Sequence, residues 1–128
     1  MKKEFAPYEL AVKLKELGFN EPCFGFYLED GTWTPASYSR EGTVYPSNTD
    51  LLPEWCAALL HQQASRWFRE KYNLYCGILT EYSYGGQLHA YHITGKRQGD
   101  VSIGGFNTYE EAELACLTKL IEIVEQKL

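Results

Sequence analysis

The chain has 128 residues, 45% of them hydrophobic and 15% aromatic, and a formal net charge of -5. This length suits one domain with a substantial core, and the aromatic content argues against disorder. The negative charge disfavours general binding to nucleic acid or anionic lipid, because such binding depends on clustered lysine and arginine. The sequence therefore predicts a single folded domain over residues 1–128, with no membrane and no nucleic acid among its expected partners.

The first residues, MKKEFAPYELAVKL, hold a basic pair but no uninterrupted apolar region and no small-residue cleavage site. They do not match a secretory signal, and no stretch approaches the roughly 20 apolar residues that cross a membrane. We therefore expect a soluble cytoplasmic protein. Its four cysteines are far apart and form no C-x-x-C pair, so we expect them to be reduced, buried and small hydrophobic side chains: Cys23, Cys56, Cys76 and Cys116.

The first half of the chain begins with a predicted helix over residues 7–17, which Gly18 can end. Residues 23–29 alternate as a strand does, and Asp30-Gly31 predicts a two-residue hairpin turn into a short strand over 32–34. Pro35 limits that second strand, because proline cannot donate a ladder hydrogen bond.

Residues 36–50 are rich in Ser, Gly, Pro, Asn and Thr, which predicts an irregular loop with a short strand near 43–45. A second helix is predicted from Pro53 to about Tyr72. Asp50 or a neighbour would cap it, and Asn73 would end it in a left-handed conformation.

The second half continues with predicted strands over 74–82, 87–94 and 101–103, separated by turns. The last helix, over 108–128, is the clearest signal in the sequence. Thr108 and Glu111 have the spacing of a capping box, and apolar residues recur behind them at intervals of three and four. The fold class predicted is α+β, a layered domain with one antiparallel sheet of about five or six strands and three helices mainly on one face. The expected order is helix, two or three strands, helix, three strands, helix.

The only histidines close in sequence are His89 and His92, in the predicted strand 87–94. An offset of three in a strand puts two side chains on opposite faces, so we expect no shared metal. The sequence also lacks a G-x-S-x-G elbow and a phosphate-binding loop, and Cys76 beside Gly77 indicates packing in a strand. We therefore predict no catalytic residue, no metal and no cofactor, and we favour a protein that is not an enzyme.

The hairpin of strands 74–82 and 87–94 holds one candidate ligand site. If the turn is centred on Gly85-Gly86, Tyr82 faces His89 and Thr80 faces Tyr91 on the more apolar side of the sheet. Tyr82, His89 and Tyr91 are then the candidate polar contacts of a small-molecule pocket between the sheet and residues 36–50.

Two resemblances concern the second half of the chain. Its order of helix, three strands and helix resembles the topology of double-stranded RNA-binding domains. Those domains place lysines at the start of the last helix, whereas this chain has Glu110, Glu111 and Glu113 there, which would repel phosphates.

The segments QQASRWFREKYNLY and TYEEAELACLTKLIEIVEQ resemble uncharacterised small proteins of phages and mobile elements of gut bacteria. That resemblance implies a small cytosolic accessory protein that binds a host or phage macromolecule.

The favoured function is a non-enzymatic protein-interaction module, because tyrosine and tryptophan anchor many interfaces. The candidate interaction surface is Trp33, Tyr38 and Tyr45, beside the predicted loop 36–50. The expected partner is a protein, and the chain itself would be a monomer or a homodimer, since the apolar stripe of the last helix is wide enough for a subunit contact. The first alternative is a small-molecule-binding protein or an enzyme that uses the pocket between the sheet and residues 36–50. The second is an acidic mimic of nucleic acid, which would gather acids on one face, among them Glu110, Glu111, Glu113, Glu122 and Glu125.

Overall fold

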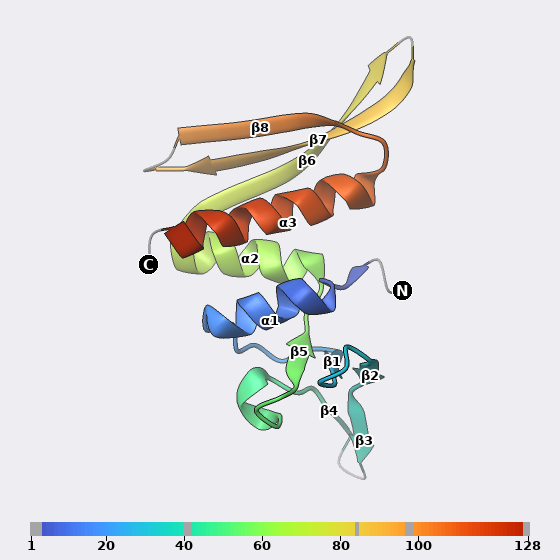
Figure 1. Ribbon diagram of the computed structural model, residues 1–128, viewed down its shortest axis with the longest axis vertical. Helices are drawn as coiled ribbons and strands as arrows, with labels where there is room; N and C mark the ends of the chain where they lie inside the picture. The colour runs from blue at the N-terminus through green and yellow to red at the C-terminus, as the bar shows by residue number, and fades with distance from the viewer. Residues whose placement is uncertain (1–3, 40–41, 84, 97–98, 127–128) are drawn as a thin grey trace. The chain divides into compact units, whose positions relative to one another are not determined.

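The computed structural model describes residues 4–39, 42–83, 85–96 and 99–126, apart from the side chains of Tyr38, Ser39 and Ser83 (Figure 1). The chain divides into two compact units, Met1–Leu60 and His61–Leu128. Each unit has a helix, antiparallel strands and buried apolar residues. The expectation of one domain over residues 1–128 stays a prediction.

The first unit begins with helix α1, Tyr8–Glu16. Pro7 precedes it in an extended conformation, and Gly18, with φ of 100°, follows its last turn in the left-handed region that glycine tolerates best. Leu10, Ala11 and Leu14 form its buried side. The predicted first helix and its glycine stop are confirmed.

Three short strands form an antiparallel sheet in the order β2-β1-β5, with β1 at Gly25–Tyr27, β2 at Trp33–Pro35 and β5 at Cys56–Ala58. The predicted two-residue turn between β1 and β2 is wrong, because the loop has three residues. Leu28 N donates to Thr32 O at 2.9 Å, and Gly31 supplies the left-handed residue with φ of 87°. Three-residue hairpin loops commonly place glycine there.

The largest correction concerns the predicted helix from Pro53 to Tyr72, whose first part is strand β5 instead. Residues 56–59 are all buried, and Cys56–Ala58 pairs with β1. A strand buried on both faces has a continuous apolar run, and periodicity alone does not distinguish such a run from a buried helix segment. The helix itself, α2, spans His61–Tyr72 and ends, as predicted, at Asn73 with φ of 55°.

The segment predicted as an irregular loop, 36–50, contains more structure than expected. Strands β3, Ser37–Ser39, and β4, Gly42–Val44, form a separate two-stranded sheet. A single 3-10 turn follows at Asn48–Asp50, where Ser47 and Asp50 make a capping box.

The second unit consists of α2, three long strands and helix α3 at Tyr109–Gln126. The strands are β6 at Leu74–Ser83, β7 at Gly86–Gly95 and β8 at Gly99–Phe106, in the antiparallel order β6-β7-β8. Thr108 Oγ1 accepts a hydrogen bond from Glu111 N at 3.1 Å, which confirms the predicted start of α3. Both helices of this unit lie on the same face of the sheet (Figure 1).

The two faces of this sheet differ because side chains alternate along each strand. On the face that meets the helices, Leu74, Tyr91 and Ile93 are buried. No helix of the second unit covers the opposite face in the described residues, and we call it the open face. It is formed by Tyr75, Gly77, Leu79 and Glu81 of β6, Leu88, Ala90, His92 and Thr94 of β7, and Asp100, Ser102 and Gly104 of β8.

A bulge interrupts the pairing of β7 with β8. His89 pairs with Phe106 and Tyr91 pairs with Ile103, so Ala90 alone lies opposite two glycines, Gly104-Gly105. Gly105 has φ of 90°, a conformation that glycine adopts without the strain imposed on other residues.

The predicted α+β class, with three α-helices and antiparallel strands, is confirmed for the described residues. The single sheet of five or six strands is not observed: the described strands form sheets of three, two and three. In the same part of the chain, no helix is long and apolar enough to span a membrane.

The side chain of Asn48 connects three segments of the first unit, which gives a stability prediction. Its Nδ2 donates to Phe19 O at 2.7 Å, and its Oδ1 accepts from Ala57 N of β5 at 2.8 Å. We expect Asn48→Ala to lower the free energy of unfolding by roughly 1–3 kcal/mol, because two part-buried backbone groups lose their partner. Urea denaturation measures the loss, and hydrogen exchange at the Ala57 amide should accelerate with it.

The matched control is Asn20→Ala, which removes one exposed hydrogen bond, from Thr49 N to Asn20 Oδ1 at 2.9 Å. Its expected loss is below about 1 kcal/mol, since water replaces an exposed bond. Equal losses for the two variants would contradict the role assigned to Asn48.

Candidate functional site

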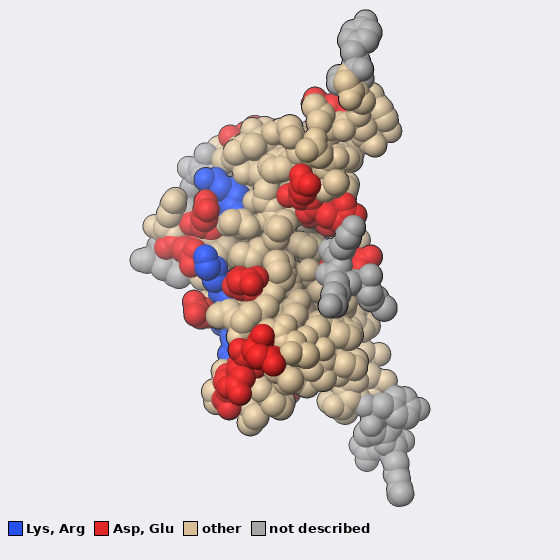
Figure 2. Space-filling view, turned by 45° about the vertical axis from the view of Figure 1, so that its right-hand side comes forward, with Lys and Arg blue, Asp and Glu red and all other residues tan. Residues whose placement is uncertain are grey.

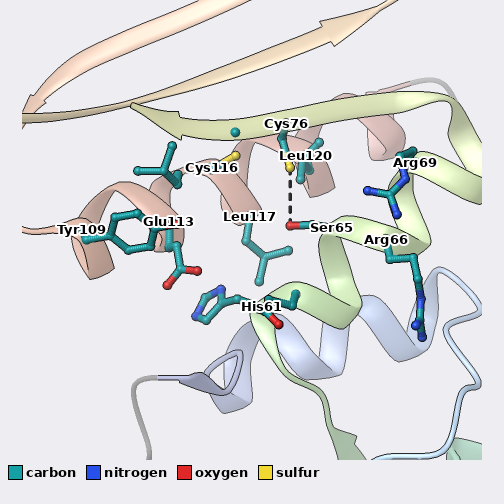
Figure 3. Close-up of a pocket in the computed structure, with 13 residues that line it drawn as sticks. His61, Ser65, Arg66, Arg69, Cys76, Tyr109, Glu113, Cys116, Leu117 and Leu120 are labelled. Atoms are coloured by element: carbon teal, nitrogen blue, oxygen red, sulfur yellow. Dashed lines mark hydrogen bonds between the residues drawn. The ribbon is translucent and has the colours of Figure 1, made fainter. Parts of the chain in front are cut away.

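The second unit contains a cavity of about 380 Å³ between α2, α3 and β6 (Figure 3). Two cysteines line it, Cys76 from β6 and Cys116 from α3, and α2 contributes Ser65 and Arg69. We call this cavity the thiol pocket. Its volume is within the range of pockets that bind small molecules.

Regular periodicity brings the two cysteines to one place. Cys76 lies two residues after buried Leu74, so both point toward the helices. Cys116 belongs to the buried stripe of α3 with Ala112 and Leu120, spaced by four residues. The sequence analysis interpreted both cysteines as packing residues and overlooked this convergence. The signal was available, because Cys76 falls on the helix-facing side of its strand and Cys116 falls on the buried stripe of its helix.

The surroundings of Cys76 favour its thiolate. The Cys116 thiol beside it, with smaller contributions from Ser65 and the charge of Arg69, lowers the pKa of Cys76 to about 6 against the opposing effect of burial. In the thiol form, Cys76 Sγ donates to Ser65 Oγ at 3.4 Å. The neighbouring Cys76 and burial raise the pKa of Cys116 well above its usual range, so the negative charge of the pair resides on Cys76.

The other end of the thiol pocket carries His61, Tyr109 and Glu113 (Figure 3). Burial lowers the pKa of His61, so its imidazole is neutral at pH 7. Burial and the nearby charges of Glu113 and Cys76 raise the pKa of Tyr109, which keeps its hydroxyl protonated. The pocket therefore combines the Cys76 thiolate with the neutral side chains of His61 and Tyr109 and with charged groups of both signs, Glu113, Arg66 and Arg69. Among the residues that the structure describes, no group of three or more His, Cys, Asp or Glu is placed to hold a metal ion.

The three predicted ligand-binding residues do not converge on one site. Tyr82 is 82% exposed, whereas His89 and Tyr91 are buried. His89 Nδ1 forms a 3.0 Å hydrogen bond with Thr80 Oγ1, and the Tyr91 ring packs against Phe106 with centroids 6.0 Å apart.

The predicted register of the hairpin is also wrong. Ser83 pairs with Gly86, so the strands pair closer to the turn than predicted, and residue 84 lies outside the described residues. Tyr82 consequently pairs with Gln87, and Thr80 pairs with His89. Each partner is displaced by two residues, and a displacement of two keeps every side chain on its predicted side of the sheet.

The two histidines of β7 lie on opposite faces, as their spacing predicts. His92 is on the open face, where its Nε2 is 2.7 Å from Thr94 Oγ1 and its Nδ1 is 3.4 Å from Ser102 Oγ. Thr94 Oγ1 donates to Asp100 Oδ1 at 3.0 Å, so it accepts from His92 Nε2, and Nδ1 is left to accept from Ser102. These four side chains form a hydrogen-bonded row across the polar end of the open face.

The predicted interaction surface is only partly exposed. Trp33 is half-buried and packs on Phe5, with ring centroids 5.4 Å apart. Tyr45 is 47% exposed and meets Phe24 edge to face. The side chain of Tyr38 lies outside the described part, so this surface stays a prediction.

The acidic residues named for the mimic belong to α3 and do not form one cluster. On the face that Figure 2 shows, acidic side chains stand in several groups, with lysine or arginine beside some of them. The five glutamates of α3 lie toward its two ends: Glu110, Glu111 and Glu113 in its first turns, and Glu122 and Glu125 in its last. With a rise of about 1.5 Å per residue, these groups are on the order of 15 Å apart, which gives a nucleic-acid mimic no support.

No family model, curated protein or solved structure matches the chain.

The thiol pocket gives a prediction for cysteine reactivity. We expect iodoacetamide to alkylate Cys76 at a rate that rises through about pH 6 and is already near its plateau at pH 7, because alkylation requires the thiolate. Peptide mapping by mass spectrometry over a pH series measures this rate for each cysteine. Cys56, whose pKa burial raises to about 11, should stay unmodified at pH 7 and serves as the internal reference.

Ser65→Ala should move the midpoint for Cys76 to higher pH, since it removes one hydrogen bond to the thiolate. Thr118→Ala is the matched control: it removes a hydroxyl of α3 that bonds Leu114 O at 2.8 Å and does not contact Cys76. A Cys76 midpoint between pH 8 and 9, the ordinary range of a free thiol, would refute the proposed environment.

Proposed function

We propose that the chain is a non-enzymatic interaction protein whose second unit binds a protein partner through the open face. The observation that carries the proposal is the exposure of large apolar side chains on a sheet face that no described helix of this unit covers. Tyr75 and Leu79 are 53% exposed and Leu88 is 39% exposed. Apolar surface gathered in one place commonly marks a site of protein interaction.

The shape of the open face supports docking. Small residues occupy its middle rows, with Gly77 beside His92 and Ala90 beside Gly104. A shallow hollow of about 180 Å³ lies next to Leu88, Ala90 and Gly104. Such a hollow between larger apolar side chains can accept one side chain of a partner, which is how interface hot spots are commonly built.

The charge of the open face indicates what kind of partner fits. Its ionised groups are Glu81 and Asp100, and its other positions carry no lysine or arginine. A complementary surface therefore presents apolar side chains together with lysine or arginine. A second copy of the chain would bring carboxylates against carboxylates, so we commit to a different protein as the occupant.

The proposal agrees with the class of small accessory proteins that the segments QQASRWFREKYNLY and TYEEAELACLTKLIEIVEQ resemble. It places the interaction on the sheet of the second unit in addition to the sequence-predicted residues Trp33, Tyr38 and Tyr45 of the first.

The proposal predicts the effect of substitutions on the open face. We expect Leu79→Glu to reduce partner binding at least tenfold, because it buries an unpaired charge at the centre of the interface. Glu81→Lys should weaken binding less and should make it less sensitive to salt, since it removes an attraction for basic groups. Binding is measured by titration of the tagged full-length chain with a partner isolated from native lysate after nuclease treatment.

The matched control is Leu114→Glu, which places the same new charge on α3, where Leu114 is 42% exposed. This variant should bind like the unmodified chain. Equal loss in both leucine variants, or binding that depends on intact nucleic acid, would refute the proposal. Self-association that Leu79→Glu abolishes would also refute it, because the open face would then bind a second copy.

A further inference from the structure

We propose that Cys76 and Cys116 form a peroxide-responsive pair, in which Cys76 is oxidised first and Cys116 then closes a disulfide that joins β6 to α3. This modification site is independent of the open face. It rests on the convergence of two thiols in one pocket, on their difference in access to solvent, and on the polar groups beside Cys76.

The two sulfurs have different access to a small solute. Cys76 is half-buried and faces the thiol pocket, which is open to solvent, whereas Cys116 is only 4% exposed. Peroxide therefore reaches Cys76 before Cys116. Both cysteines line the same pocket, and Figure 3 shows their sulfurs on the same side of it, so Cys116 is placed to attack an oxidised Cys76.

The polar groups of the pocket suit the first step. Ser65 Oγ lies 3.4 Å from Cys76 Sγ, and Arg69, which also lines the pocket, stabilises negative charge on that sulfur. Figure 3 shows these groups on α2 beside the sulfur. Reactive cysteines occur in such partly exposed surroundings beside positive charge.

The chemistry balances with hydrogen peroxide as the oxidant. The Cys76 thiolate attacks one peroxide oxygen and the O–O bond breaks, which leaves Cys76 as a sulfenic acid. The departing hydroxide takes up the proton that Cys76 released to solvent on ionisation and becomes water. The Cys116 sulfur then attacks Cys76, an S–S bond forms and the S–O bond breaks. The proton of Cys116 leaves with the hydroxyl group as water. Two thiols are oxidised, one peroxide is reduced, and two waters result.

The remaining cysteines provide internal references. Cys23 and Cys56 are buried in the first unit. Cys23 donates to Glu21 O at 3.3 Å, and burial raises the pKa of Cys56 to about 11. Neither thiol has the exposure that the reaction requires, and burial also disfavours the thiolate of Cys56.

To test the proposal, the reduced full-length chain is treated with an equimolar amount of hydrogen peroxide. Free thiols are then blocked with iodoacetamide, and the peptides are mapped by mass spectrometry. We expect a Cys76–Cys116 disulfide, at least tenfold more abundant than oxidation at Cys23 or Cys56, and its complete reversal by dithiothreitol. This measurement needs no variant, so a folding defect cannot obscure it.

Two variants separate the roles of the cysteines. Cys116→Ser should accumulate a sulfenic acid at Cys76 that dimedone traps, and Cys76→Ser should leave Cys116 unoxidised at the same dose. Uniform oxidation of all four cysteines would overturn the proposal. A disulfide from Cys76 to a second molecule would equally overturn the role assigned to Cys116.

Discussion

The strict alternation of side chains along β6 and β7 is the constraint on which the second unit depends. Because consecutive residues point to opposite faces, one set supplies the apolar contacts for α2 and α3, and the other set is left on the open face. Cys76 and Tyr75 are neighbours in sequence, yet one lines the thiol pocket and the other is exposed. A shift of one residue in pairing would exchange the two sets and would remove both the pocket and the proposed docking surface.

Much of this architecture was predictable from the sequence, because it depends on local patterns. The capping threonine and the apolar stripe predicted α3, and the strand alternation predicted which side of β6 and β7 meets the helices. The β5 segment was not predictable in this way. Its run of apolar residues satisfies a helix and a buried strand equally, and only pairing with β1, about thirty residues earlier, decides between them. The third residue of the β1–β2 loop escaped prediction for a related reason, since Asp-Gly is compatible with more than one hairpin loop.

The thiol pocket was harder to predict than the fold. Cys76 and Cys116 are forty residues apart and match no spacing motif. Their proximity follows from the packing of α3 on the sheet, and the effect of Ser65 and Arg69 follows from the position of α2. The sequence predicted Tyr82, His89 and Tyr91 as one site, but the structure does not bring them together. Those residues were assigned to the correct face, but a register error of two residues and a large difference in burial separate them. Face assignment survives such an error, whereas the composition of a site does not.

The bulge opposite Ala90 bears on how this sheet meets other chains. A regular outer strand offers a row of unused amide and carbonyl groups, along which another strand can add and begin an aggregate. In β8, the extra glycine and the left-handed Gly105 break that row near its end. Strand addition along this edge is thereby discouraged, so the β8 side of the sheet can present side chains of the open face to a partner without also pairing with another copy through its backbone.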